Sequence, residues 1–327
     1  MHMADALLSP AVGGAMMVVS GGLILSSIRE IHREFEESRV PLMGAAGAFV
    51  FAAQMINFAI PGTGSSGHIA GAVLLSALLG SAPAFLVMAS VLLVQALFFA
   101  DGGLLAFGAN LFNMGFFGCF VAYPFLFRPL AEKTASAGWL TFGTCAACVA
   151  GLELGALAVT IETLASGVTE LPFWAFAAAM LPIHLAIGLG EGLATAAVLI
   201  FVRKNLPDFA SVRLDCGRMT LRRLCVTFGL AALVFGGGLS LIASSRPDGL
   251  EWSMERVAGS AELASDSVPS LLEQIGHFFA ILPDYAFPGS ESSLGTTVSG
   301  IVGAFLCAAL LAAVGFLFCG SGKVRES

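Results

Sequence analysis

The sequence predicts an all-α polytopic membrane protein with about nine transmembrane or half-membrane helices. Its 327 residues are 57% hydrophobic and only 11% charged, whereas soluble domains carry about 25% charged residues. The mean hydropathy of +0.90 is more apolar than a soluble chain of this size can bury. The net charge of −7 also lacks the basic surface that nucleic acid requires. These observations exclude a soluble globular enzyme, a disordered protein and a nucleic-acid binder.

Long apolar runs follow one another through the chain, and about 20 such residues cross a bilayer as a helix. Only helices or closed barrels satisfy backbone polar groups in lipid, so we expect each run to be helical. The segment 68–80 is too short to span the bilayer alone. In order, the predicted segments are 9–29, 40–60, 68–80, 81–99, 103–127, 138–162, 171–202, 221–243 and 298–319.

Positive charges separate the predicted loops into two groups. With the N-terminus outside, the cytoplasmic segments hold 13 of the 15 Lys and Arg residues, and only Arg246 and Arg256 lie outside. Because Lys and Arg favour the cytoplasmic side, the sequence predicts an outer N-terminus and a cytoplasmic C-terminus. The start has no basic region or small-residue cleavage site, so we expect the mature chain to begin with Met1 and His2.

A basic stretch divides the chain into a membrane domain of residues 1–204, a cytoplasmic connector of residues 205–218 and a two-helix domain of residues 219–327. The connector is either a positive-inside anchor, which we favour, or a contact for cytoplasmic partners. An outer loop at 245–297 carries eight acidic residues and two arginines. It is either a solvated loop, which we favour, or a segment that concentrates cations and braces the N-terminal site.

The first two residues offer a set of metal donors. The amine of Met1 and the amide nitrogen of His2 close a five-membered chelate ring, and that nitrogen and Nδ1 of His2 close a six-membered ring. His68 follows a Gly-rich loop on the same predicted face and can supply a fourth nitrogen. A tetragonal set of nitrogens is diagnostic of Ni(II) or Cu(II), with Co(II) a weaker fit. Taken singly, each histidine is more typical of a surface or helix-end residue.

Other polar residues lie within or beside the apolar segments, where ionisable groups are costly and are therefore candidates for function. Asp5 can orient the N-terminal peptide. Asn110 and Asn113 share one helical face. His184 and Glu191 also share a face, two helical turns apart. For Asn110 and for this pair we favour interhelical hydrogen bonds. The remaining supporting candidates are Gln54, Asn57, Gln95 and Asp101.

Several motifs carry a specific resemblance to a known family. The chain resembles the CbiM/NikM substrate-binding components of cobalt/nickel energy-coupling factor transporters in the opening MHMADALLSP and in residues 64–80 (GSSGHIAGAVLLSALLG), 95–115 (QALFFADGGLLAFGANLFNMG) and 184–199 (HLAIGLGEGLATAAVL). Residues 246–252, RPDGLEW, resemble the signature of the companion small membrane component, so the chain resembles a fusion of both components. It departs from the family at Ala4 and Ala6, where proline and glycine usually flank the aspartate.

The resemblance implies a substrate-capture subunit of an ATP-driven importer for Ni(II) or Co(II), in the inner (plasma) membrane of a prokaryote. It implies Met1, His2 and His68 as the ligands of the transported ion, the set that the chelate geometry also indicates. It implies no resident cofactor and no enzyme activity. The chain lacks a P-loop, so the implied partners are a transmembrane coupling component and ATP-binding-cassette ATPase subunits. The alternative is a secondary ion-coupled permease in which Glu153 or Glu191 carries protons.

Overall fold

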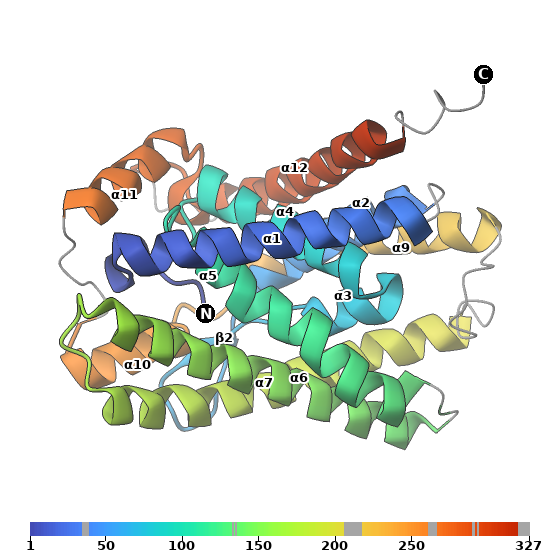
Figure 1. The fold of residues 1–327 in the computed structure, drawn as a ribbon. Coiled ribbons are helices and arrows are strands. Elements are labelled where there is room, and N and C mark those ends of the chain that lie inside the picture. The colour runs from blue at the N-terminus through green and yellow to red at the C-terminus, as the bar shows by residue number, and fades with distance from the viewer. Residues whose placement is uncertain are drawn as a thin grey trace.

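The computed structural model describes residues 1–34, 39–132, 134, 136–205, 218–260, 267–289, 292 and 294–319. Within these residues the chain is mostly helical, and most of its long helices run lengthwise through the molecule (Figure 1). The prediction of an all-α multi-pass membrane protein is confirmed, because seven of the described helices are long and apolar enough to cross a membrane. They are α1 (Pro10–Glu34), α4 (Ser81–Phe98), α5 (Phe107–Leu111) continued by the π-helical η3 (Phe112–Glu132), α6 (Ala137–Ser166), α7 (Phe173–Asn205), α9 (Arg218–Gly237) and α12 (Leu294–Cys319).

Two shorter apolar helices complete the predicted series, α2 (Val40–Gln54) and α3 (Ala72–Leu79). The prediction that the helix starting near residue 40 continues to residue 60 is wrong. Beyond its end the backbone forms β1 (Phe58–Ala59), which pairs in antiparallel register with β2 (Ser66–Gly67). The loop between these strands turns at Gly62 and Gly64, whose φ values of 78° and 81° suit glycine. This hairpin delivers the chain to His68.

The segment 245–297, which the sequence predicts to be an outer polar loop, is more ordered than that prediction. It contains α10 (Gly249–Ala258), α11 (Ser267–Phe279) and a 3-10 turn, η5 (Pro283–Tyr285), and it follows another 3-10 turn, η4 (Leu239–Ile242). Helix α10 begins with a capping box, in which the side chain of Asp248 accepts from the backbone of Leu250 and Glu251. The spacing of Asp and Glu three residues apart is a sequence signature of a helix start, so this helix was predictable.

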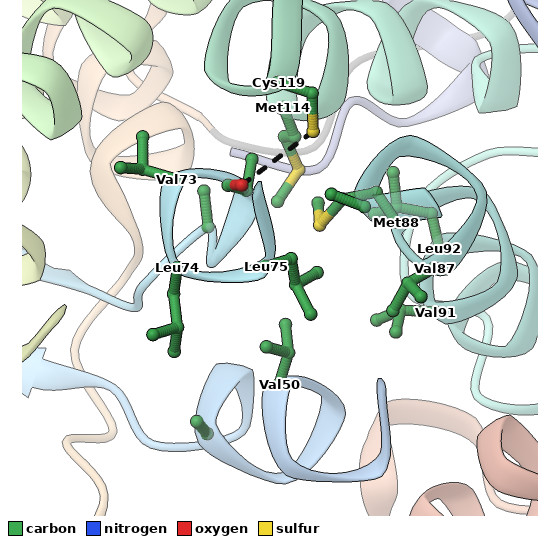
Figure 2. Packing of buried hydrophobic residues seen from close by; sticks show 14 of the residues in the cluster. Val50, Val73, Leu74, Leu75, Val87, Met88, Val91, Leu92, Met114 and Cys119 are labelled. Carbon is green, nitrogen blue, oxygen red and sulfur yellow. Dashed lines mark hydrogen bonds between the residues drawn. The ribbon is translucent and has the colours of Figure 1, made fainter. Parts of the chain in front are cut away.

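The core lies around α4, which other elements cover on most sides. Its side chains Val87 and Met88 face Val50 of α2 and Leu75 of α3 in the hydrophobic interior (Figure 2). Elsewhere α6 packs along α7 and η3. Cys119, Cys145, Cys148, Cys225 and Cys307 are free thiols.

The last two long helices pack onto the first part of the chain. Helices α9 and α12 both contact α2 and each other. A Cβ on Gly300 of α12 would lie 2.2 Å from the carbonyl oxygen of Gly236 in α9, so only glycine permits this approach. Apart from its two end residues, the connector 205–218 lies outside the described residues. The division into domains and the outer position of the N-terminus stay predictions.

Candidate metal site

The first eight residues run into the bundle rather than over its surface. Met3 is fully buried, and the N-terminus lies in the middle of the molecule (Figure 1). Asn110 holds the backbone of Met3 at two points, because its Oδ1 accepts from the Met3 N–H at 2.7 Å and its Nδ2 donates to the Met3 carbonyl at 3.1 Å. One turn on, Asn113 donates to the Met3 thioether and to Glu162. The predicted asparagine pair therefore lies on the face that fixes the N-terminal peptide.

Asp5 ties this peptide to the turn before α5. Its Oδ1 accepts from the Ala106 N–H at 2.9 Å. A Cβ on Gly103 would lie 1.7 Å from the same oxygen, so the turn closes on Asp5 because it carries a glycine there. Burial raises the pKa of this carboxyl. The location agrees with an orienting role.

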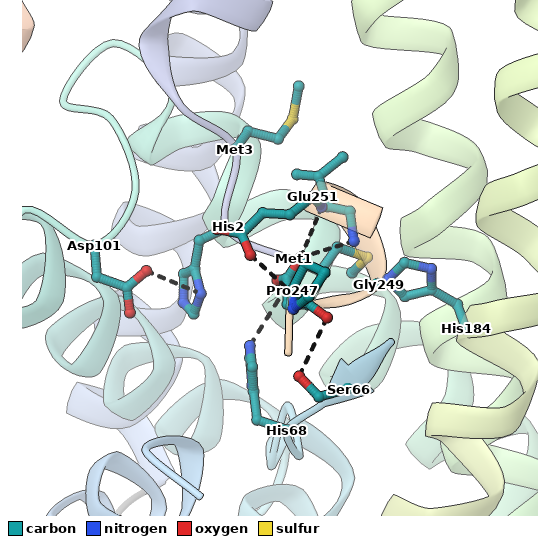
Figure 3. A network of polar contacts seen from close by, with 12 residues as sticks. Met1, His2, Met3, Ser66, His68, Asp101, His184, Pro247, Gly249 and Glu251 are labelled. Atoms are coloured by element: carbon teal, nitrogen blue, oxygen red, sulfur yellow. Dashed lines mark hydrogen bonds and ion pairs between the residues drawn. The ribbon is translucent and has the colours of Figure 1, made fainter. Parts of the chain in front are cut away.

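The amine of Met1 lies between two groups from distant parts of the chain. It donates to Asp248 Oδ2 at 2.7 Å and lies 3.4 Å from Nε2 of His68 (Figure 3). Burial alone would raise the pKa of Asp248, but the adjacent ammonium group holds that pKa well below its usual range. The carboxylate is thus charged and pairs with the terminal ammonium.

His2 stacks on His68, with ring centroids 5.2 Å apart. Its Nδ1 lies 3.3 Å from Asp101 Oδ1, and its Nε2 lies 3.2 Å from Gln95 Oε1. Burial lowers the pKa of the His2 imidazole, and Asp101 opposes this shift. The two histidines predicted to share a membrane face are therefore in direct contact.

A chain of amides assigns the proton on the His2 ring. The carbonyl of Ala70 can only accept, so Nε2 of Gln54 donates to it at 2.8 Å. Oε1 of Gln54 then accepts from Nε2 of Gln95 at 2.7 Å, which leaves Oε1 of Gln95 facing His2. An oxygen acceptor there requires the His2 proton on Nε2. The other nitrogen, Nδ1, is the one that the chelate requires.

The same reasoning applies to His68. Its Nδ1 lies 3.0 Å from the Ile69 carbonyl, so the proton is on Nδ1 and the lone pair is on Nε2, which faces the Met1 amine. Burial lowers the pKa of His68 to about 3, so the ring is neutral near pH 7. The following backbone is fixed by Glu191, whose two carboxylate oxygens accept from the N–H groups of Ala70 and Gly71 at 2.8 and 2.9 Å.

The structure leaves one predicted candidate apart. Asn57 joins the hairpin to the C-terminal part of the chain, because its carbonyl accepts from the Ser244 N–H at 2.7 Å. Within the described residues its side-chain oxygen is buried without a hydrogen-bond partner.

His184 lies beside the site and does not contact Glu191; its Nδ1 bonds to the Met180 carbonyl of its own helix. Glu191 accepts instead from the backbone of Ala70 and Gly71, ahead of α3, so these bonds are not the interhelical ones favoured for this pair.

Two residues of the segment 245–297 were not among the predicted site residues. Asp248 contacts the Met1 amine, and the hydroxyl of Tyr285 donates to Asp101 Oδ2 at 2.5 Å. Asp248 belongs to the RPDGLEW motif, which was the available signal, whereas nothing in the sequence marks Tyr285.

Within the described residues no three His, Cys, Asp or Glu side chains gather as a metal cage. The donor set proposed from the sequence combines two imidazoles with two main-chain nitrogens.

Two family comparisons cover most of the chain. Residues 2–209 match the family described as the cobalt uptake substrate-specific transmembrane region. Residues 222–319 match the PDGLE domain.

Individual relatives match along most of their own length. A Rhodobacter capsulatus protein named fused nickel transport protein NikMN is 30% identical over 94% of this chain and 95% of its own. A Sorangium cellulosum protein named cobalt transport protein CbiM is 31% identical over 64% of this chain and 93% of its own. A crystal structure described as a transition metal transporter superposes with a TM-score of 0.54 at 30% identity, and covers 62% of this chain and 93% of that one.

Proposed function

The chain belongs to the cobalt-uptake transmembrane (CbiM) family of nickel and cobalt transport proteins, and from this premise we propose that it captures Ni(II) or Co(II) in a nitrogen chelate at its N-terminus. The proposed donors are the Met1 amine, the amide nitrogen and Nδ1 of His2, and Nε2 of His68. The observation that carries the proposal is the 3.4 Å approach of the Met1 amine to His68 Nε2. This approach places two of the four proposed donor nitrogens next to each other.

Hydrogen bonds around the histidines support this donor set. Metal-binding histidines usually donate their second ring N–H to an oxygen, which fixes the tautomer and orients the ring. His68 does so through the Ile69 carbonyl, and His2 does so through Gln95. His68 therefore holds a lone pair on the nitrogen that the chelate needs, whereas Nδ1 of His2 faces Asp101 at 3.3 Å and must give up this contact. On binding, Nδ1 of His2 exchanges Asp101 for the metal.

The charge balance of the buried site also favours a divalent cation. Binding removes one proton from the Met1 ammonium and one from the His2 amide, while the ion adds two positive charges. The net charge of the site is then unchanged. Asp248 and Asp101, which face the ammonium and the imidazole, remain as counter-ions of the complex. Burying a charge is costly unless it is compensated, so an exchange that conserves charge suits this interior.

We further propose that separate subunits supply the energy, as a transmembrane coupling component and ATP-binding-cassette ATPases. Membership of the family and the absence of a P-loop from the sequence support this arrangement. A secondary ion-coupled permease would need a carboxylate that is free to exchange protons. Glu191 is a poor carrier, because two backbone N–H groups hold it.

The test uses the full chain, purified with its native start or extended by one residue before Met1. We expect calorimetry to show tight Ni(II) and Co(II) binding with the native start and its loss on extension. Equal affinity in the two proteins would contradict the chelate. Uptake in cells should stop when the partner ATPase is inactivated. Uptake by the chain alone that collapses with the proton gradient would instead favour the permease.

A further inference from the structure

A third buried histidine lies beside the proposed chelate. His184 belongs to α7 and is 1% exposed. It lies 11 residues into the helix, about 16 Å from its start at 1.5 Å per residue. An ionisable side chain this far along a membrane-spanning helix is expensive to keep there. Its presence needs a physical reason.

The hydrogen bonds of His184 leave one nitrogen available. Its Nδ1 lies 2.8 Å from the Met180 carbonyl, which can only accept, so the proton is on Nδ1. Nε2 then holds a lone pair. This atom is buried and has no hydrogen-bond partner within the described residues. The pattern repeats that of His68, where Nδ1–H also donates to a carbonyl and Nε2 also keeps a lone pair.

The free nitrogen faces the proposed metal site. His184 lines a small cavity together with Met1, His68 and Asp248. The cavity volume is about 10 Å³, close to the minimum that one water molecule needs. In Figure 3 the imidazole points toward Gly249, at the start of α10, and a Cβ on Gly249 would lie 3.2 Å from Nε2. The glycine therefore keeps the space in front of the nitrogen open.

We propose that Nε2 of His184 is a second, inner ligand, which takes the transported ion when it leaves the N-terminal chelate. The inference rests on the proposed function. His68 lines the same cavity, so it can stay bound while the ion exchanges the Met1 and His2 nitrogens for His184. The amine and amide of the chelate regain their two protons from solvent in this step. The cavity has room for a bare ion and not for its hydration shell, and imidazole suits Ni(II) and Co(II).

A simpler explanation is that Nε2 accepts a hydrogen bond from one water molecule in the cavity. Glutamine distinguishes the two, because its amide can bond to water but binds these metals weakly. His184→Gln should therefore keep the fold and the affinity of the N-terminal chelate, and should slow Co(II) uptake in cells carrying the complete transporter by about tenfold or more. His277→Gln, at an exposed histidine of α11, is the matched control.

A spectroscopic measurement separates a ligand from a packing residue. The His2→Ala protein lacks the chelate and should retain weak Co(II) binding, seen as visible absorption at high Co(II) concentration. This absorption should disappear in the His2→Ala/His184→Gln protein and persist in the His2→Ala/His277→Gln protein.

These experiments separate a failure of the inner ligand from a failure of the proposed function. If the unsubstituted protein binds neither Ni(II) nor Co(II), the proposed function fails. If it binds them but His184→Gln leaves uptake and the weak Co(II) absorption unchanged, or removes the chelate affinity itself, only the inner ligand is overturned.

Discussion

The terminal amine of Met1 lies 2.7 Å from Asp248 Oδ2, across 247 residues of chain. The contact joins the first residue to the segment that carries the PDGLE signature, and both groups are largely buried. The same carboxylate caps α10 through its other oxygen. One side chain thus links the start of the chain, the site and the start of α10.

Replacing Asp248 should measure how much its ion pair with the Met1 amine contributes to stability. Asp248→Asn keeps the oxygen that caps α10 but removes the charge opposite the ammonium. Because a buried cation without its partner is unfavourable, we expect the unfolding free energy of the metal-free protein to fall by about 1–3 kcal/mol. Denaturant unfolding in detergent measures this. Glu251→Gln, at the exposed carboxylate of the same capping box, is the control and should change little.

Removing the Asn110 clamp should loosen the N-terminal peptide. Asn110→Leu has a similar volume but neither accepts from nor donates to Met3, so residues 1 and 2 lose their fixed position. We expect Ni(II) affinity to fall about 10- to 100-fold, as when groups that orient metal ligands are lost. Titration calorimetry is the measurement, with Asn205→Leu at the exposed end of α7 as control. Unchanged affinity would show that the clamp is dispensable.

Tyr285 should act on metal affinity through Asp101. Tyr285→Phe removes the hydroxyl that donates to Asp101 but keeps the ring stacked on Phe99 at 4.9 Å. A single hydrogen bond contributes about 0.5–1.5 kcal/mol, so a change of about two- to tenfold in Ni(II) affinity is expected, with thermal stability nearly preserved. If stability falls and affinity does not, the tyrosine only packs.

Acidification should destabilise the metal-free protein. Burial lowers the pKa of His2 and of His68, the latter to about 3. Below the ordinary histidine value of about 6.5, the unfolded chain therefore binds more protons than the folded one. Stability that is full above this value is lost as the pH falls, by up to about 1.4 kcal/mol per pH unit for each histidine.

Thermal unfolding between pH 7.5 and 5 tests whether stability falls as the pH falls. His68→Gln should show a flatter pH dependence, because one of the titrating groups is gone. His277→Gln, on the exposed face of α11, should follow the unsubstituted protein. A pH dependence that is identical in all three proteins would contradict the assignment.

Replacing Glu191 distinguishes a structural role of its carboxylate from a role as a proton carrier. Glu191→Gln keeps one oxygen acceptor but leaves one of the Ala70 and Gly71 N–H groups without a partner, so His68 should shift and Ni(II) affinity should fall. Calorimetry on the purified protein measures this. Normal affinity combined with abolished uptake would instead indicate a proton carrier and the permease mechanism.

Much of the architecture was predictable from local sequence. Each of the nine predicted segments contains a helix within the described residues, because apolar length alone forces a helix in lipid. The error at residues 55–60 arose because those residues continue the apolar pattern, whereas pairing with Ser66–Gly67 makes Phe58–Ala59 a strand. The segment 245–297 was predicted as a polar loop because of its net charge, yet it holds two helices, and the capping box of Asp248 and Glu251 indicates the first of them, α10.

The residues of the site also fall into two groups, those that the sequence predicts and those that only the fold reveals. The sequence by itself determined the class of protein and the chelating start, because Met1 and His2 are covalently adjacent and their ring sizes follow from bond connectivity. Only the tertiary structure decided which groups surround them. Asp248, Tyr285 and His184 reach the site through helix packing across many residues, and no local pattern encodes such contacts. The folded hydrogen-bond network likewise decided that Nε2 of His68 and Nε2 of His184 keep their lone pairs, since each tautomer depends on its neighbour.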